Sequence, residues 1–144
     1  MQLNTYLSFG GDCRQALESY AELLGGTVMG MMTFGEMPPQ EGCGEMPASV
    51  KDRIMHGCVE IGGHLLMGTD ATPDHPYRGI TGSYITFQTA DVAESERVFA
   101  ALSRDARRIE MPLQQTFWAK RYGSLVDRHG VPWMVNCSDP CPEG

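Results

Sequence analysis

The chain has 144 residues, of which 42% are hydrophobic and 20% charged, and its formal net charge is −7. This length and composition are typical of a folded globular domain rather than a disordered chain. The acidic balance argues against a nucleic-acid partner, because neutralising phosphates requires clustered lysine and arginine side chains.

The sequence has no apolar run long enough to cross a membrane and no N-terminal signal pattern. We therefore expect a cytoplasmic protein without a membrane partner. Its five cysteines lack Cys-x-x-Cys spacing, so neither a disulfide framework nor a zinc site is expected. Cys137 and Cys141 lie close together in a proline-containing tail, where two ligands alone would make a poor metal site.

The first element predicted is a half-buried strand over residues 2–9, with Leu7 and Phe9 on one face and Tyr6 and Ser8 on the other.

A helix is expected next, capped by Asp12 with Gln15 in the capping-box position, and ending at Gly25 and Gly26. Its predicted buried residues are Ala16, Tyr20, Leu23 and Leu24.

A strand is then predicted over 27–34. Residues 36–52 are rich in proline and glycine and lack a period, which predicts a long loop. Two further strands, 53–61 and 64–69, are expected to be joined by a glycine hairpin turn. The following segment, with two prolines and a glycine, is interpreted as a linker.

The second half repeats this order. It predicts strands over 83–89, 107–115, 117–126 and 132–138, with a turn over 127–130 before the last of them. A helix capped by Asp91, with Glu94 in the capping-box position, should follow the first strand. Its predicted buried residues are Val98, Phe99 and Leu102.

The two halves are also similar in sequence. Residues 6–12 (Tyr-Leu-Ser-Phe-Gly-Gly-Asp) recur with one insertion as residues 84–91 (Tyr-Ile-Thr-Phe-Gln-Thr-Ala-Asp), and 63–67 resembles 130–134. Each half therefore has the predicted order β-α-β-β-β. We expect a single domain over 1–144, made of module one (1–70), a linker (71–81), module two (82–138) and a tail (139–144).

This module order, with an Asp-x-x-Gly turn before the last strand, resembles the vicinal oxygen chelate superfamily, which contains glyoxalases, bleomycin-resistance proteins and extradiol dioxygenases. The resemblance is closest to its PhnB-like branch and rests on five segments: 6–9, 34–38, 66–70, 115–119 (Gln-Thr-Phe-Trp-Ala) and 130–136 (Gly-Val-Pro-Trp-Met-Val-Asn). It implies an α+β fold in which two tandem modules form a curved sheet around a cavity, commonly in a dimer.

Proteins of the PhnB-like branch are often named demethylubiquinone methyltransferases. A common S-adenosylmethionine site would need a Gly-x-Gly-x-Gly loop between a strand and a helix. The sequence offers Gly10 and Gly11 there, which are more typical of a tight turn. We therefore do not expect a methyltransferase.

The resemblance also implies four inward-facing metal-ligand positions, which fall on Asn4, Met67, Gly82 and Met134. None offers the carboxylate, imidazole or thiolate donor that a divalent metal needs. Thioether sulfur suits Cu(I), but methionines on apolar strands more often serve packing. We predict no divalent metal at these positions and no other cofactor.

The four histidines do not replace these ligands in the sequence. His56 and His64 flank the hairpin, and a cross-strand pair between them would be the first place to look for an unexpected metal. His75 falls in the linker, and His129 falls in a turn that looks exposed.

The cavity is expected on the sheet face opposite the helices. Its predicted ligand-binding residues are Tyr6, Ser8, Met67, Tyr84, Thr86, Gln114, Phe117, Trp118, Trp133 and Met134. Aromatic and methionine side chains with few polar groups suit small apolar ligands; the alternative is that these aromatics form the core. No catalytic residue is identified, although Glu110 is a candidate general base.

We therefore expect a small-molecule-binding protein that lacks the superfamily's metal. The alternative is a glyoxalase- or dioxygenase-like enzyme, either with relocated metal ligands or as a metal-independent lyase or isomerase. A third reading gives the main role to a protein partner that contacts residues 36–52. A homodimer is expected, because the open apolar sheet faces are too large for a soluble monomer to expose.

Overall fold

The computed structural model describes residues 1–38, 41–42 and 44–139. The chain forms two compact units, Met1–Gly79 and Ile80–Gly144. Cys43 and Cys141 lie outside the described residues, so the predicted Cys137–Cys141 neighbourhood does too. No helix of the described residues is long and apolar enough to span a bilayer.

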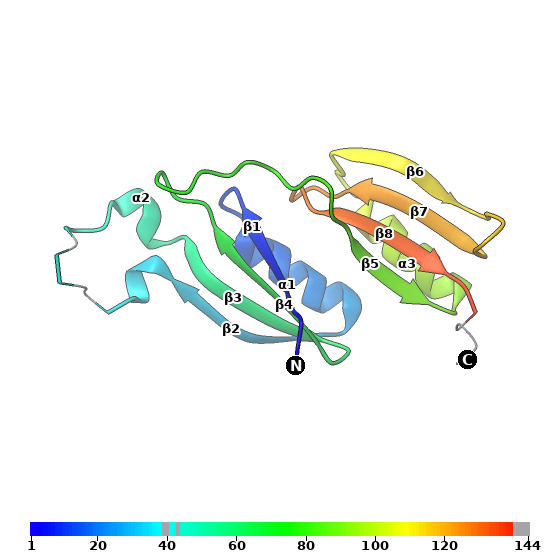
Figure 1. The fold of residues 1–144 in the computed structure, drawn as a ribbon, viewed down its shortest axis with the longest axis horizontal. Coiled ribbons are helices and arrows are strands. Elements are labelled where there is room, and N and C mark those ends of the chain that lie inside the picture. Colours follow the sequence, from blue (N-terminus) through cyan, green and yellow to red (C-terminus); the bar gives the residue numbers. More distant parts are fainter. Residues whose placement is uncertain (39–40, 43, 140–144) are drawn as a thin grey trace. The chain divides into compact units, whose positions relative to one another are not determined.

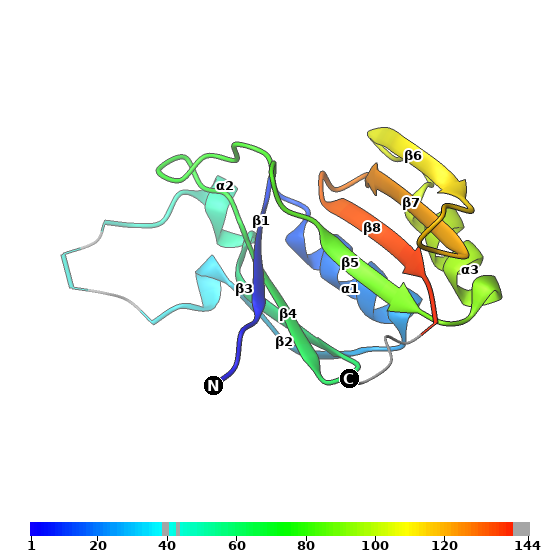
Figure 2. The ribbon, with the colours of Figure 1, turned by 45° about the vertical axis from the view of Figure 1, so that its right-hand side comes forward.

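The first unit is one mixed sheet with a helix along one face (Figures 1 and 2). Its elements are β1 (Thr5–Phe9), α1 (Cys13–Leu24), β2 (Thr27–Thr33), η1 (Phe34–Glu36), α2 (Ala48–Lys51), β3 (Ile54–Ile61) and β4 (His64–Asp70). The strand order is β1-β4-β3-β2. β1 runs parallel to β4, and the other pairs are antiparallel.

The helix α1 forms because one stripe of its residues is apolar and packs on the sheet. Its buried residues are Cys13, Ala16, Leu17, Tyr20 and Ala21. The predicted Ala16 and Tyr20 are among them, whereas Leu23 and Leu24 are only half-buried. The helix ends at Gly25, whose φ of 70° is left-handed and suits a residue without a side chain.

The predicted side-chain cap at Asp12 is wrong, because its carboxylate makes no capping hydrogen bond. The buried Asp70 at the end of β4 takes that role instead. Its Oδ1 accepts the backbone N–H of Cys13 at 2.9 Å, and its Oδ2 accepts that of Ile54 at 2.8 Å. A single carboxylate therefore joins the starts of α1 and β3 to the end of β4.

Residues 36–52 are not a loop throughout, as predicted, because they contain the end of η1 and the short helix α2. The apolar Val50 is buried there, which gives α2 a packed side.

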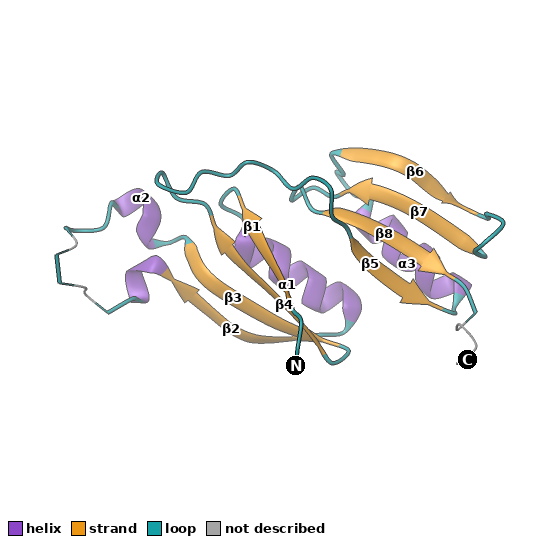
Figure 3. Cartoon of the chain, viewed as in Figure 1, coloured by secondary structure: helices purple, strands orange, loops and turns teal. Residues whose placement is uncertain are grey.

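The second unit repeats the plan of the first (Figure 3). Its elements are β5 (Ile85–Thr89), α3 (Val92–Leu102), β6 (Arg108–Gln114), β7 (Arg121–Val126) and β8 (Pro132–Cys137), and its strand order is β5-β8-β7-β6. β5 runs parallel to β8, as β1 does to β4. The predicted α+β class with two tandem β-α-β-β-β modules is confirmed. The cavity expected around the curved sheet stays a prediction.

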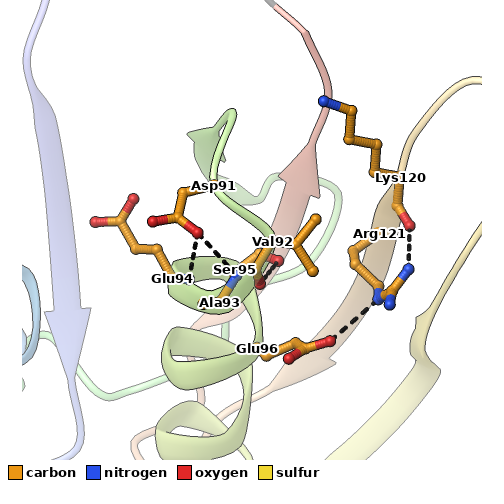
Figure 4. Close-up of polar contacts among 8 residues, drawn as sticks. All are labelled: Asp91, Val92, Ala93, Glu94, Ser95, Glu96, Lys120 and Arg121. Carbon is orange, nitrogen blue, oxygen red and sulfur yellow. Dashed lines mark hydrogen bonds and ion pairs between the residues drawn. The ribbon is translucent and has the colours of Figure 1, made fainter.

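The predicted cap of α3 is confirmed. Asp91 Oδ1 accepts the backbone N–H groups of Ala93 and Glu94 at 2.9 and 3.3 Å (Figure 4). The Thr89 hydroxyl donates to the Glu94 carboxylate at 2.6 Å and accepts the backbone N–H of Asp91. It therefore bridges the Glu94 side chain and the Asp91 backbone, the two groups that a capping box joins. An ion pair of 3.3 Å between Glu96 and Arg121 ties α3 to β7 (Figure 4). Val98, Phe99 and Leu102 are buried, as expected.

The predicted strand over 117–126 begins later than expected, because β7 starts at Arg121. Thr116 closes a turn over the two residues that follow it: its N–H donates to the Ala119 carbonyl and its hydroxyl accepts the Ala119 N–H, both at 3.1 Å. Phe117 and Trp118 therefore lie in a turn rather than in the sheet.

Candidate functional site

The open face of the first unit is the sheet face opposite α1. Leu7 and Phe9 point to the helix side and are buried, whereas Tyr6 and Ser8 lie on the open face, as strand alternation predicts. The register pairs Tyr6 with Met67 on β4. Three of the predicted ligand-binding residues of this unit therefore share one surface. Ligand binding there remains a prediction.

A tyrosine–histidine contact crosses this open face. The Tyr6 hydroxyl lies 3.2 Å from His56 Nδ1, and the two rings are 5.7 Å apart. Tyr6 is on β1 and His56 on β3, so the contact spans the intervening strand β4. Partial burial, with a smaller contribution from Cys13, raises the pKa of Tyr6, and its hydroxyl stays protonated at neutral pH.

The His56–His64 pair considered from the sequence is not formed. His64 lies at the start of β4 opposite Ile61, near the hairpin turn, and is exposed. His56 lies near the start of β3, away from the hairpin, and contacts Tyr6 instead. Sequence reasoning did not find this partner, because it depends on which strands become neighbours.

A pocket of about 460 Å³ lies at one end of this face, within the first unit. Its lining includes Ser8, Phe34, Met55, Thr69, His75 and Arg78. Within the part of the chain that the structure describes, neither the Ser8 hydroxyl nor the Arg78 guanidinium has a hydrogen-bond or ion-pair partner. Two polar groups are thus available beside apolar walls.

The second unit has its own open face, opposite α3. The register places Thr86 on β5 and Ser124 on β7 on either side of Met134. In the first unit the corresponding methionine, Met67, pairs with Tyr6. Thr86, not Tyr84, is therefore the structural counterpart of Tyr6. The sequence alignment of Tyr6 with Tyr84 is therefore wrong by two residues. In the register Phe9 corresponds to Thr89, so the second unit is one residue shorter, not longer, between its first strand and Asp91.

Tyr84 lies just before β5 and reaches the other edge of the sheet. Its hydroxyl donates to Glu110 Oε2 at 2.7 Å, while Glu110 Oε1 lies 3.3 Å from the Arg108 guanidinium. The hydrogen bond to Glu110 raises the pKa of the Tyr84 phenol. Glu110, the candidate general base, thus has a partner on both carboxylate oxygens.

Trp133 was predicted to bind ligand, but it lies on the helix side of its sheet rather than on the open face. It is 1% exposed, and its indole N–H donates to the buried Asp127 at 2.9 Å. Met134, its neighbour, lies on the opposite face. His129, expected in an exposed turn, is buried as well, and the Asp127 carboxylate accepts its backbone N–H.

Phe117 and Trp118 form an exposed aromatic turn in the second unit. Phe117 is 98% exposed and packs edge-on against Trp118 with ring centres 4.7 Å apart, and Trp118 lies 5.4 Å from Tyr122. A shallow hollow of about 240 Å³ beside them is lined by Lys120 and Asp139, among others. Gln114, the last residue of β6, is also exposed.

The four positions implied for a divalent metal do not fit one. Asn4 and Gly82 precede β1 and β5, and Met67 and Met134 lie on β4 and β8. The corrected register makes Tyr84, not Gly82, the counterpart of Asn4, and its phenol donates to Glu110. An amide, two thioethers and a glycine offer no carboxylate or imidazole to a hard cation. Nowhere in residues 1–38, 41–42 and 44–139 do three or more His, Cys, Asp or Glu side chains converge as a metal site.

Comparison with known proteins now assigns the family. The sequence model of the Glyoxalase/Bleomycin resistance protein/Dioxygenase superfamily matches residues 2–135. The chain belongs to this superfamily. Protein YjdN of Escherichia coli is 36% identical to it in an alignment 143 residues long that covers 94% of this chain and 95% of that protein.

Two solved structures extend the comparison. Protein PA1353 of Pseudomonas aeruginosa is 42% identical with a TM-score of 0.86, covering 97% of this chain and 99% of its own. A PhnB protein of Bacillus cereus, named a candidate 3-demethylubiquinone-9 3-methyltransferase, has a TM-score of 0.79 at 22% identity, covering 96% and 100%. The second likeness shows the shared fold alone. The superfamily resemblance drawn from the sequence is confirmed, with a PhnB protein among the structural neighbours.

Proposed function

We propose that this superfamily member binds a small organic molecule without the divalent metal of its enzymatic relatives. The observation that carries the proposal is the pocket of about 460 Å³ on the first unit. Ligand pockets are commonly about 300–1,000 Å³ in size and combine apolar walls with a few polar groups. Phe34 and Met55 supply apolar wall, and Ser8 and Arg78 supply polar groups without protein partners.

Two features favour binding over the enzymatic alternative. The positions implied for the metal carry donors of the wrong chemistry, and the candidate base Glu110 already accepts two polar contacts. Glu110 also lies outside the lining of the pocket on the first unit, so a molecule bound there would not meet it. The methyltransferase name of the PhnB relative gains no support from the turn at Gly10 and Gly11.

We also propose a homodimer located in the cytoplasm. Each unit exposes large apolar side chains, including Met29 (62% exposed) on β2 in the first and Phe117 (98%) in the second. Exposed apolar groups that gather on soluble proteins often mark interfaces. The exposed open faces and this aromatic turn would then contribute to both ligand binding and assembly.

The experiment is native mass spectrometry of small molecules that copurify with the protein, followed by binding of the molecule so identified. Ser8→Trp fills the pocket and is expected to reduce retention at least about tenfold, since it removes the space that the ligand occupies. Gln88→Trp is the matched control, because Gln88 holds the equivalent position on β5. Equal retention by parent and Ser8→Trp, with both folded by circular dichroism, would reject the pocket as the site.

A further inference from the structure

Two sulfur donors and an imidazole occupy neighbouring positions on the open face of the first unit. Cys58 on β3 lies directly opposite Met67 on β4. His56 precedes Cys58 by two positions on the same strand, so it lies on the same face. Residues directly opposite in antiparallel strands have Cα atoms roughly 4.5–5.5 Å apart, so Cys58 and Met67 are direct neighbours on this face.

The contact with Tyr6 orients the imidazole across β4, the strand that carries Met67. In the tautomer with the proton on Nδ1, His56 donates to the Tyr6 oxygen and leaves the lone pair of Nε2 free. A hydrogen bond on the second ring nitrogen is the usual support of a metal-binding histidine.

Cys58 is also the accessible thiol within the described part of the chain. It is half-buried, whereas Cys13 and Cys137 are both 0% exposed. On the β2 side, Cys58 faces Gly30, and a Cβ placed on that glycine would meet nothing within 4 Å. Open space therefore lies beside the thiol, on the face that also carries Met67.

The second unit lacks this donor set at the equivalent place. Met134 corresponds to Met67, but its neighbours in the register are the hydroxyl residues Thr86 and Ser124. The first unit has Tyr6 and a thiol in their place. Beside a shared methionine, the units thus differ at two donor positions: the second has the hydroxyl of Ser124 in place of the Cys58 thiol, and the phenol of Tyr122 in place of the His56 imidazole.

We propose that the open face of the first unit binds a soft monovalent cation, Cu(I) or its analogue Ag(I), through Cys58 Sγ, Met67 Sδ and His56 Nε2. Thiolate and thioether ligands select such cations over hard divalent ones. Binding replaces the thiol proton by the metal and releases that proton to solvent, with no change in oxidation state. The proposal is independent of the organic ligand, whose pocket lies around Ser8 and Arg78.

The test is anaerobic Cu(I) competition against the chromophoric chelator bicinchoninate, with Ag(I) as a second probe. The full chain is used with Cys43→Ser and Cys141→Ser, so that these two thiols do not compete. We expect one cation per chain, a sulfur-to-metal absorption band in the ultraviolet, and an affinity that rises with pH. Cys58→Ser should abolish stoichiometric binding and the band, and it copies the serine of the second unit.

Single substitutions distinguish the loss of a metal ligand from a general effect on the protein. Met67→Leu and His56→Gln should each weaken binding at least about tenfold, and Tyr6→Phe by about tenfold, the usual cost of losing a partner that orients a ligand. Met134→Leu, the matched control, should bind as the parent does. The proposal is overturned if the parent binds no stoichiometric Cu(I), if Cys58→Ser binds as tightly as the parent, or if Met134→Leu and Met67→Leu have equal effects.

Discussion

Among the residues that the structure describes, Asp70 and Asp127 are the two buried carboxylates, and they hold the ends of strands in place. Asp70 accepts backbone N–H groups from Cys13 and Ile54, and Asp127 accepts those of His129 and Val131 together with an indole N–H. A buried N–H left without a partner costs about 1–3 kcal/mol. Each carboxylate therefore contributes stability through several bonds and fixes the backbone at the end of a strand.

At the same scale, Cys13 should make stability fall at alkaline pH. Burial, with Asp70 and Asp12 nearby, raises the pKa of the Cys13 thiol from 9.0 to about 12. Between these two pH values the unfolded chain loses the Cys13 proton, whereas the folded chain keeps it. The contribution of the protonated thiol to stability is therefore complete below pH 9 and is lost as pH rises through this window.

The check is the free energy of unfolding in urea from about pH 8 to about pH 10, compared with Cys13→Ala. The parent should lose stability more steeply than the variant, by at most about 1.4 kcal/mol per pH unit. Parallel pH profiles of the two proteins would show that the thiol does not remain protonated in the folded state.

Among the elements, the two helix starts are built differently although their sequences look alike. Asp91 caps α3 through its own side chain, whereas the start of α1 depends on Asp70 from another strand. Asp91→Ala should therefore destabilise the protein by about 1 kcal/mol, the usual cost of losing an N-cap. Asp12→Ala should cost less. Chemical denaturation of the two variants compares them, and a larger loss for Asp12→Ala would contradict this account.

Strand alternation and turn residues were sufficient to predict most of the fold. They predicted the faces of Leu7 and Tyr6, the glycine stop of α1 and the hairpin before His64, because these depend on local periodicity. They failed for Asp12, because a carboxylate distant in sequence takes its capping role. They failed for Trp133 as well, because the register decides which face it lies on. They also failed for Phe117, an apolar residue that favours strands but lies where a threonine closes a turn.

The candidate site was harder to predict than the fold. Alternation placed Tyr6, Ser8 and Met67 together, but their neighbours His56 and Cys58 come from a strand whose register the sequence does not state. The alternation of Cys58 with buried Gly57 and Val59 was a usable signal for its face. The residue opposite Cys58 follows only from the pairing of β3 with β4.

For the whole molecule, the exposed aromatic and methionine side chains predict self-association. Light scattering with size-exclusion chromatography should return about twice the chain mass of 15.8 kDa at micromolar concentration. Phe117→Ser, which removes a side chain that is 98% exposed, should shift the equilibrium toward monomer without unfolding either unit. A mass of one chain for the parent over the micromolar range would refute the dimer.

The pairing of β1 with β4 and of β5 with β8 has a consequence for biosynthesis. Each unit begins with an edge strand whose partner is the last strand of the same unit, so these contacts are distant along the chain and slow to form. As the ribosome delivers the chain, Leu7 and Phe9 leave the exit tunnel well before residues 64–70 exist to receive them. Slow translation through 64–70 or 132–137 would lengthen the time for which an apolar strand is open to aggregation.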